Sequence, residues 1–418
     1  MRCTMKEYIR SEYIKRALAN LPQLVLEVTD ACNLRCKYCA YGELYEDYDK
    51  RDGIEMDFAM AKRLIDYLYR FWTSEEYAVS KGTLFVSFYG GEPLMNMPMI
   101  KQVVEYVRAL EIPRRHIRFS MTSNALLLDK YMDYLVKHEF SLLISLDGNA
   151  RNDSYRIDCS GHPSFDRVIR NLNLLRDRYP SYFFENVNFN SVLHDRNSVE
   201  EIYEFVRGQY GKIPNISELN NVGVKQEKRQ EFESMFISSR DSMNKSKKKE
   251  EMARELFMRN SDYRSLALFL HWYSGFYYDD YTDLLFDKGD PPFIPTGTCI
   301  PFTRKLYLSV NGKILPCERI GQQFALGSVT DSEVLIDVEH IARECNKRLA
   351  RMEKRCLACY NKKACSQCMY NLEGIDETPK CQGFMDKAAF RSYCESNMLL
   401  IRQSPSLYRK IMSEVISS

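Results

Sequence analysis

Strand-like and helix-like segments alternate along the first half of the chain, and this alternation restricts the possible fold more than any other feature. Short runs rich in β-branched and aromatic residues predict strands at 24–30, 83–91, 117–124, 141–148 and 186–193. Apolar residues recurring every three or four positions predict helices at 56–72, 97–110, 128–139, 164–178 and 198–209. Strands that alternate with helices favour a parallel sheet or barrel of the α/β class.

Polar motifs follow several of the expected strands. They are the cysteine-containing stretch DACNLRCKYCAY (30–41), GGEP (90–93), TSN (122–124) and SLDG (145–148). Parallel sheets and barrels place their sites at the carboxyl ends of the strands. The shared location of these motifs is therefore stronger evidence for a functional site than any one of them.

The stretch 30–41 holds three cysteines within eight residues, Cys32, Cys36 and Cys39. A disulfide uses two cysteines, and a structural zinc site normally closes with four ligands. An iron–sulfur cube is usually held by one thiolate per iron, so three thiolates would leave one iron open to a substrate or cofactor.

The composition is that of an ordinary protein of two or three domains, with 418 residues, 45% hydrophobic and 28% charged. A net charge of +2 gives no strong attraction to nucleic acid or to an anionic membrane. No apolar run approaches the roughly 18 residues of a membrane span. The start, MRCTMKEYIR, lacks the apolar core of a signal peptide. We therefore expect a cytoplasmic protein whose 14 cysteines are reduced or bound to metal.

The spacing C-x3-C-x2-C, with Tyr38 before the last cysteine and GGEP after the next strand, resembles the radical S-adenosylmethionine (radical SAM) enzymes. The resemblance implies a partial barrel of about six strands and helices. It also implies that Cys32, Cys36 and Cys39 hold a 4Fe–4S cluster whose fourth iron binds S-adenosylmethionine. Cleavage of that cofactor would yield a 5′-deoxyadenosyl radical that abstracts hydrogen from the substrate.

Further cofactor contacts follow from the same resemblance. Gly90 and Gly91, which lack a Cβ, would let the backbone approach the ligand. Glu92 would accept hydrogen bonds from the methionine ammonium, and Pro93 would stiffen the turn. Tyr38 would lie beside the cofactor as part of the cysteine motif.

Three more residues are candidate cofactor contacts, each with a structural alternative. Ser145 would meet the nucleoside, or else only make a hydrogen bond at the strand end. Arg156 would meet the carboxylate or ribose region, or else form a surface salt bridge. Asn124 follows the third strand, where asparagine is as often a turn residue.

A second group of cysteines lies in the C-terminal part of the sequence. Residues 299–317 read C-x12-G-x4-C, with Cys299, Gly312 and Cys317, and 304–317 predicts a hairpin that turns at Asn311-Gly312. The run CLACYNKKACSQC then contains the cysteines at 356, 359, 365 and 368, and Cys381 follows. This pattern resembles the SPASM extension of radical SAM enzymes, although its x2 spacing before Cys368 is one residue short of the family's x3.

The SPASM resemblance implies two auxiliary 4Fe–4S clusters. One would be held by Cys356, Cys359, Cys365 and Cys381. The other would be held by Cys299, Cys317 and Cys368, with Cys345 or Cys394 as a candidate fourth ligand, or with an open iron. The alternative is a zinc-binding module, because paired C-x2-C units also suit zinc. Cys3 and Cys159 are expected to be ordinary thiols, and so are Cys345 and Cys394, as the alternative to a ligand role.

These features divide the chain into five expected segments. They are an N-terminal extension (1–23), a radical SAM partial barrel (24–224), a helical insert or bridge (225–295), a SPASM auxiliary-cluster domain (296–385) and a C-terminal helix (386–418). The aromatic-rich stretch 271–286 is expected to pack between domains, or else to form a substrate wall.

Enzymes with this pairing of domains modify peptides or proteins. We expect a maturase that uses the radical to install a cross-link (thioether or carbon–carbon) or an epimerised residue in a ribosomally synthesised peptide under anaerobic conditions. The expected partners are the precursor peptide and an electron donor such as flavodoxin or ferredoxin, with neither nucleic acid nor membrane. The alternative of another class is an inactive radical-SAM-like protein that binds a peptide.

A second enzyme alternative is an anaerobic sulfatase-maturating enzyme, which forms formylglycine. That family has an aspartate base just after the cysteine that matches Cys317, whereas this sequence has Glu318. Glu318 is a candidate catalytic base, and a surface role is an equal alternative. Because only about 23 residues precede the first strand, we expect no additional N-terminal peptide-binding domain. The leader peptide would then bind the barrel, the 225–295 insert or a separate protein.

Overall fold

The structure is a computed structural model that describes residues 6–46, 48–274, 285 and 293–416. Contacts group the chain into two compact units. We call Glu12–Met252 with Ile300–Val338 the barrel unit, and Met1–Ser11, Ala253–Cys299 and Glu339–Ser418 the C-terminal unit. The five segments expected from the sequence stay a prediction, because contact groups and functional domains need not share boundaries. Cys3 and most of the aromatic-rich stretch 271–286 lie outside the described residues.

Six neighbouring parallel strands form the main part of the barrel unit, in the order in which they occur in the sequence. They are β1 (Gln23–Thr29), β2 (Thr83–Gly90), β3 (His116–Ser123), β4 (Ser141–Ser145), β5 (Val187–Leu193) and β6 (Asn215–Glu218). The expected α/β fold with a parallel sheet is therefore confirmed.

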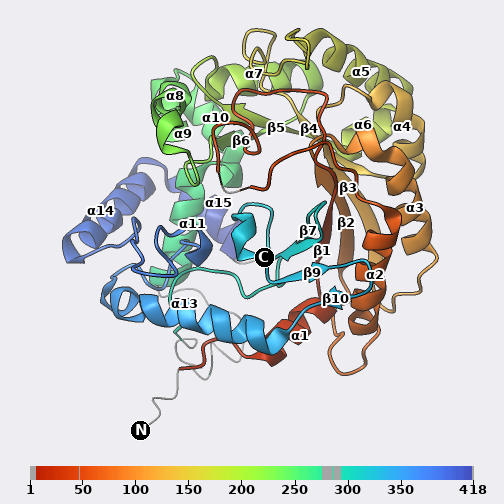
Figure 1. The fold of residues 1–418 in the computed structure, drawn as a ribbon. Coiled ribbons are helices and arrows are strands. Elements are labelled where there is room, and N and C mark those ends of the chain that lie inside the picture. Colours follow the sequence, from red (N-terminus) through yellow and green to blue (C-terminus); the bar gives the residue numbers. More distant parts are fainter. Residues whose placement is uncertain (1–5, 47, 275–284, 286–292, 417–418) are drawn as a thin grey trace. The chain divides into compact units, whose positions relative to one another are not determined.

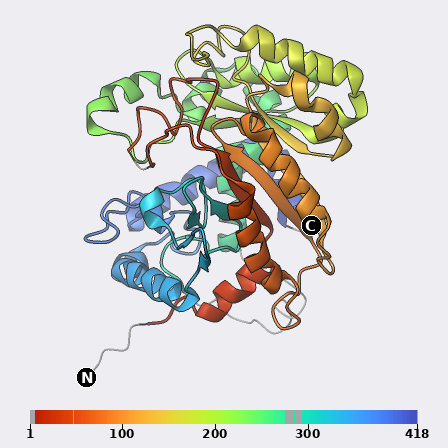
Figure 2. The same cartoon turned by 45° about the vertical axis from the view of Figure 1, so that its right-hand side comes forward.

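Helices connect these strands and cover one side of the sheet. They are α2 (Phe58–Trp72), α3 (Met97–Arg108), α4 (Leu128–Lys137), α5 (Phe165–Arg178), α6 (Pro180–Asn186) and α7 (Val199–Tyr210). Figure 1 shows them along the outer side of the curved sheet, and Figure 2 shows the same arrangement turned by 45°. In α2, the predicted apolar stripe is buried at Leu64, Ile65, Leu68 and Trp72. Each such side chain contributes about 1.5–3 kcal/mol when fully buried.

A second group of strands extends the sheet beside β1. β7 (Leu306–Leu308) pairs in parallel with β1, and β8 (Lys313–Leu315), β9 (Gly327–Val329) and β10 (Val334–Leu335) continue in antiparallel pairing to give ten strands. The hairpin expected at 304–317 is confirmed, because β7 pairs with β8 across a turn that contains Gly312. This extension belongs to the barrel unit.

The remaining described elements are helical. The charged stretch after β6 forms α8 (Arg229–Met235), α9 (Ser239–Lys245) and α10 (Lys249–Leu256), and α1 (Ser11–Ala19) precedes β1. The C-terminal unit contains α11 (Ser261–Tyr273), most of α13 (Val338–Ala358), α14 (Lys387–Gln403) and α15 (Pro405–Ile411). In this unit α11, α14 and α15 share an apolar cluster that includes Leu266, Leu270, Leu407 and Ile411. Over the part of the chain that the structure describes, no helix is long and apolar enough to span a membrane.

Candidate cluster and cofactor site

The cysteine loop (residues 30–41) leaves β1 at its carboxyl end and is held against the segment that follows β4. The backbone N–H of Arg35 donates to the Ile157 carbonyl at 2.8 Å, and that of Lys37 donates to the Tyr155 carbonyl at 3.2 Å. Within the loop, the Cys39 N–H donates to the Cys36 carbonyl at 3.1 Å. These bonds fix the loop without using any thiol.

The thiols of Cys32, Cys36 and Cys39 line one cavity of about 900 Å³ in the barrel unit, together with Gly90 and Gly91. This volume lies at the upper end of the usual range for small-molecule sites, about 300–1,000 Å³. The cysteine loop and GGEP, two of the four motifs expected at the strand ends, therefore share a single cavity.

The chemistry of these three thiols fits a metal cluster. Burial raises the pKa of Cys32 to about 11 and that of Cys36 to about 12, and the neighbouring thiols contribute to both shifts. The thiols therefore hold their protons at neutral pH until a metal displaces them. Among the described residues, no three Cys, His, Asp or Glu side chains lie close enough to bind a single metal ion. The thiolates of a 4Fe–4S cube can lie farther apart than the ligands of a single metal ion, because each thiolate binds a different iron.

The glycines of GGEP have a structural role within the chain. The Gly91 N–H donates to the Thr29 carbonyl at 2.8 Å, and the Glu92 N–H donates to the Ala31 carbonyl at 2.9 Å. A Cβ on Gly90 would lie 2.1 Å from the Thr29 oxygen, and one on Gly91 would lie 2.0 Å from the Ala31 oxygen. The close approach that needs glycine is thus to the start of the cysteine loop, and both glycines also line the cavity.

Glu92 is almost fully buried, and its carboxylate is bound by the protein. Oε1 accepts hydrogen bonds from the Ser123 hydroxyl at 2.8 Å and from the Leu94 N–H at 3.1 Å, and Oε2 accepts one from the Asn124 N–H at 2.8 Å. Burial raises the pKa of Glu92, while these hydrogen bonds oppose the shift. An ionised carboxylate offers about four acceptor positions, so about one remains for the methionine ammonium expected from the sequence.

Asn124 contacts the cysteine loop directly. Its side-chain N–H group donates to Asn33 Oδ1 at 2.7 Å and lies 3.9 Å from the Cys32 sulfur, while its Oδ1 accepts from the Leu126 N–H at 3.0 Å. One side chain therefore serves both the turn and the cysteine loop, and the expected cofactor contact of Asn124 stays a prediction.

Arg156 is buried rather than part of a surface salt bridge. Its Nη1 donates to the Tyr38 hydroxyl at 3.0 Å, and its Nε lies 3.8 Å from Asp153 Oδ1. Burial opposes its charge, but Cys36, Tyr38 and nearby carboxylates raise the pKa of Arg156 well above its usual value. Ser145 lies half-buried at the end of β4. Neither Arg156 nor Ser145 is among the described residues that line the cavity, and their proposed cofactor contacts stay predictions.

A second cysteine site lies in the C-terminal unit. Its four thiols line one small cavity of about 20 Å³, together with Thr296, Lys362 and Gln367, and belong to Cys356, Cys359, Cys365 and Cys381. Burial raises the pKa of Cys356 to about 11, and the other three thiols add to the shift. These are the four cysteines that the SPASM resemblance assigned to one auxiliary cluster, and the structure brings them together.

The other cysteines lie in several places. Cys368 lies within electrostatic range of Cys299 in the C-terminal unit, whereas Cys317 follows β8 in the barrel unit. Cys345 is buried in α13, where its sulfur lies 3.5 Å from the Tyr370 hydroxyl. Cys394 packs at the edge of the apolar cluster of α11, α14 and α15. The ligand set of the first auxiliary cluster stays a prediction.

Glu318, the candidate base, forms an ion pair with Lys305 at 3.0 Å, and its Oε2 lies 3.7 Å from the Cys317 sulfur. Burial raises the pKa of Glu318, but the Lys305 cation, hydrogen bonds and Arg319 together outweigh burial and hold the pKa below its usual value. Glu318 is therefore ionised at neutral pH and is a weaker base than a buried carboxylate without a cation would be.

Sequence reasoning missed two features of the site. Cys159, expected to be an ordinary thiol, lines the same cavity, and its sulfur lies 3.7 Å from the Cys32 carbonyl oxygen. Asp147 accepts a hydrogen bond from the Tyr38 hydroxyl and so joins SLDG to the cysteine motif. The only signal for Asp147 was its place in SLDG, and Cys159 gave none.

Part of the chain is similar to known proteins. The model of the radical SAM superfamily matches residues 26–207. The radical SAM cyclopropyl synthase TigE of Paramaledivibacter caminithermalis is 30% identical over 174 residues, which cover 40% of this chain and 34% of TigE. A cysteine-type anaerobic sulfatase-maturating enzyme of Clostridium perfringens is 23% identical over 330 residues, which cover 74% of this chain and 78% of that enzyme.

For the first relatives, the matched region spans only about a third to a half of their own length. The solved structure of native anSMEcpe with bound AdoMet and Cp18Cys peptide is 16% identical, with a TM-score of 0.55, and the match covers 93% of this chain and 98% of that chain. This likeness shows the fold. Residues 26–207 are therefore a radical SAM domain, the kind of domain that binds S-adenosylmethionine and a 4Fe–4S cluster.

Proposed function

We propose that this protein is a peptide-modifying radical SAM enzyme that installs a cross-link or an epimerised residue in a ribosomally synthesised peptide. Cys32, Cys36 and Cys39 would hold the 4Fe–4S cluster, and S-adenosylmethionine bound there would supply a 5′-deoxyadenosyl radical for hydrogen abstraction. The names of several relatives support the proposal, since they modify peptides or proteins as sulfatase-maturating enzymes.

The observation that carries this proposal is the cavity at the three thiols. Its volume of about 900 Å³ leaves room for a cofactor and for a segment of a second molecule. Three thiols on its wall leave one iron of a cube without a protein ligand. A closed structural site would need neither the space nor the open position.

The charge around the cavity favours an acidic substrate segment. Its basic side chains, Arg35, Lys37, Arg51, Arg196 and Lys228, outnumber its acidic ones, Asp30, Glu43 and Glu231. Lys37 and Lys228 are partly neutralised by Glu231, at 3.4 and 3.1 Å. Arg35 is exposed at the loop and remains available to a carboxylate of the peptide.

The test is anaerobic reconstitution with iron and sulfide, followed by incubation with S-adenosylmethionine, a reductant and a peptide encoded beside the gene. The expected result is 5′-deoxyadenosine together with a peptide that has lost two hydrogens (a cross-link) or kept its mass (an epimer). Deuterium placed at the attacked position should appear in the 5′-deoxyadenosine. A reconstituted protein that makes no 5′-deoxyadenosine, but still binds the peptide, would instead be an inactive binding partner.

One observation favours the sulfatase-maturating alternative, because Glu318 lies beside Cys317 and is ionised, as a base must be. Formylglycine formation removes a proton as well as electrons, so it needs such a base beside the substrate. We expect no conversion of a sulfatase-type peptide containing C-x-P-x-R. Efficient conversion to an aldehyde, abolished by Glu318→Gln, would replace the first proposal with this one.

A further inference from the structure

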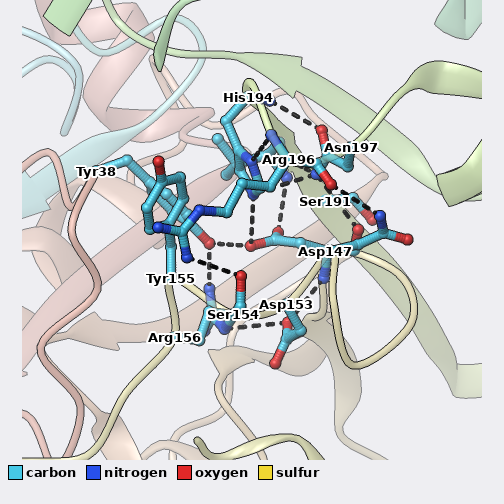
Figure 3. Close-up of polar contacts among 12 residues, drawn as sticks. Tyr38, Asp147, Asp153, Ser154, Tyr155, Arg156, Ser191, His194, Arg196 and Asn197 are labelled. Carbon is cyan, nitrogen blue, oxygen red and sulfur yellow. Dashed lines mark hydrogen bonds and ion pairs between the residues drawn. The ribbon is translucent and has the colours of Figure 1, made fainter. Parts of the chain in front are cut away.

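A buried group of polar side chains surrounds Tyr38, the residue between the second and third cysteines of the loop. We call Tyr38, Asp147, Asp153, Arg156 and His194 the Tyr38 cluster. Figure 3 shows them pointing toward one another from the cysteine loop, the SLDG segment and the end of β5. All five are buried, with exposed fractions of 7% or less.

The Tyr38 hydroxyl joins an anion to a cation. It donates a hydrogen bond to Asp147 Oδ2 and accepts one from Arg156 Nη1 at 3.0 Å. The His194 ring stacks on the Tyr38 ring with centroids 5.5 Å apart, and the Tyr155 ring packs edge-on at 6.3 Å. Tyr38 is therefore held at its hydroxyl and around its ring.

Asp147 is fixed from several sides. Its Oδ1 accepts from the Val192 N–H at 2.8 Å, and its own N–H donates to Asp153 Oδ1 at 3.0 Å. His194 Nε2 lies 3.8 Å from Asp147 Oδ2, while His194 Nδ1 accepts the Arg196 N–H at 3.2 Å. His194 Nε2 faces both Asp147 and the side-chain nitrogen of Asn197, which lies 3.2 Å away (Figure 3). Asp147 therefore cannot move away from Tyr38 without breaking these contacts.

Arg156 has two carboxyl neighbours. Asp153 Oδ1 lies 3.8 Å from its Nε, and burial raises the pKa of Asp153, with a further contribution from the nearby Asp147. Asp147 is linked to the guanidinium through one bridging group, because the Tyr38 hydroxyl donates to Asp147 and accepts from Arg156.

The Tyr38 cluster lies next to Cys36. Cys36 packs against the apolar cluster that contains Tyr38 and Tyr155. The backbone bonds of Arg35 and Lys37 tie the same loop to residues 155–157, so the segment that carries Arg156 runs beside it. Arg156 acts on Cys36 electrostatically, since its charge lowers the pKa of a thiol that burial raises.

We propose that Asp147 is a positioning residue that sets the reduction potential of the cluster held by Cys32, Cys36 and Cys39. Through Tyr38 it holds the cysteine loop in place, and by balancing Arg156 it limits the positive charge at Cys36. Reduction adds one electron to the cluster, so an uncompensated cation nearby favours the reduced form. The proposal rests on the proposed function, because it requires the cluster at this loop.

The test compares the midpoint potential of the reconstituted protein with that of Asp147→Asn. Asparagine keeps the size of the side chain and can still accept the Val192 N–H, while one buried negative charge is lost. The expected result is a higher midpoint potential at unchanged iron content. Only the cluster with an open iron changes its electron paramagnetic resonance signal when S-adenosylmethionine binds, so this change identifies the signal to be titrated.

A matched control removes the same charge elsewhere. Asp195 is exposed and accepts the Tyr155 hydroxyl at 2.9 Å, beside the Tyr38 cluster but outside it. Asp195→Asn should leave the potential unchanged. Arg156→Gln supplies a second variant that is expected to lower the potential, and the double variant Asp147→Asn/Arg156→Gln should return toward the wild-type value.

The outcomes separate the inference from the function on which it rests. An unshifted potential in fully loaded Asp147→Asn overturns the inference, and so does a loss of iron with no shift in the remaining cluster, which would show a structural role alone. If Asp147→Asn does not fold, an unshifted potential in loaded Arg156→Gln overturns it equally. A wild-type protein that binds no iron at Cys32, Cys36 and Cys39 would instead overturn the proposed function.

Discussion

The two cysteine sites of this chain use the same kind of ligand in opposite surroundings. In the barrel unit, three thiols line a cavity of about 900 Å³ between strand ends. In the C-terminal unit, four thiols line one of about 20 Å³. Burial raises thiol pKa values at both sites, so both favour the neutral thiol until metal binds. The two sites therefore present the same kind of side chain and differ in the space around it, so we call them the open site and the closed site.

The largest expected effect comes from removing the ligands of one site at a time. Full reconstitution should give roughly eleven or twelve irons per chain, at four per cube. Alanine at Cys32, Cys36 and Cys39 should remove about four irons and abolish 5′-deoxyadenosine formation. Alanine at the four cysteines of the closed site should also remove about four irons but keep the S-adenosylmethionine-dependent change in the resonance signal. Two results would contradict the distinction between the sites. One is the loss of that change in the variant without the four cysteines, and the other is zinc in place of iron at those four cysteines.

The second-largest effect is expected from adding one methyl group near each site. In Gly91→Ala the Cβ would lie 2.0 Å from the Ala31 oxygen, and in Gly297→Ala it would lie 1.9 Å from the Cys365 oxygen. Each clash is with backbone, so each variant should lose about 3 kcal/mol locally and about four irons from its own site. Gly208→Ala is the control, because a Cβ there meets nothing within 4 Å in α7. Equal iron loss from both sites in either variant would show that the sites are not independent.

The glycines also show where sequence reasoning stopped. The strands and helices of the barrel unit were predictable because their apolar residues follow the periods of a strand or a helix. The pairing of β7 with β1 was not, since Leu306 and Leu24 are far apart in the sequence and no local pattern names a partner. The GGEP motif predicted a close approach at Gly91, but only the structure shows that the approaching group is the Ala31 carbonyl.

In the candidate site, too, some features could be predicted from the sequence and others could not. Cys32, Cys36 and Cys39 could be named as the expected ligands from the sequence, because their spacing is itself the signal. It could not place Tyr38 between Asp147 and Arg156, which lie 109 and 118 residues away along the chain. A contact of that kind depends on how β4 and the segment after it fold over the loop.

A smaller effect is expected at Glu92. Glu92→Gln should weaken S-adenosylmethionine binding about tenfold to a hundredfold, since a charged hydrogen bond contributes roughly 1.5–3 kcal/mol. Equilibrium dialysis of the reconstituted protein measures this. The amide nitrogen would replace either Oε1, which accepts the Leu94 N–H, or Oε2, which accepts the Asn124 N–H, so one of these hydrogen bonds would be lost and the apoprotein should melt at a lower temperature. Unchanged affinity would remove Glu92 from the cofactor site and leave it only the structural role.

The smallest effect is a pH dependence at the open site that the closed site should lack. Burial and the nearby Asp147 raise the pKa of Asp153 to about 8, with Arg156 opposing the shift. The folded state then keeps a proton that the unfolded chain loses near pH 4, so the free energy of unfolding falls as the pH rises from about 4 to about 8. Asp153→Asn removes this titration, and its melting temperature relative to wild type should become more positive from about pH 5 to about pH 8. Asp166→Asn, at an exposed residue in the first turn of α5, should show a constant difference over the same range. A constant difference for Asp153→Asn would mean that Asp153 is ionised, and Arg156 would then be balanced by two anions instead of one.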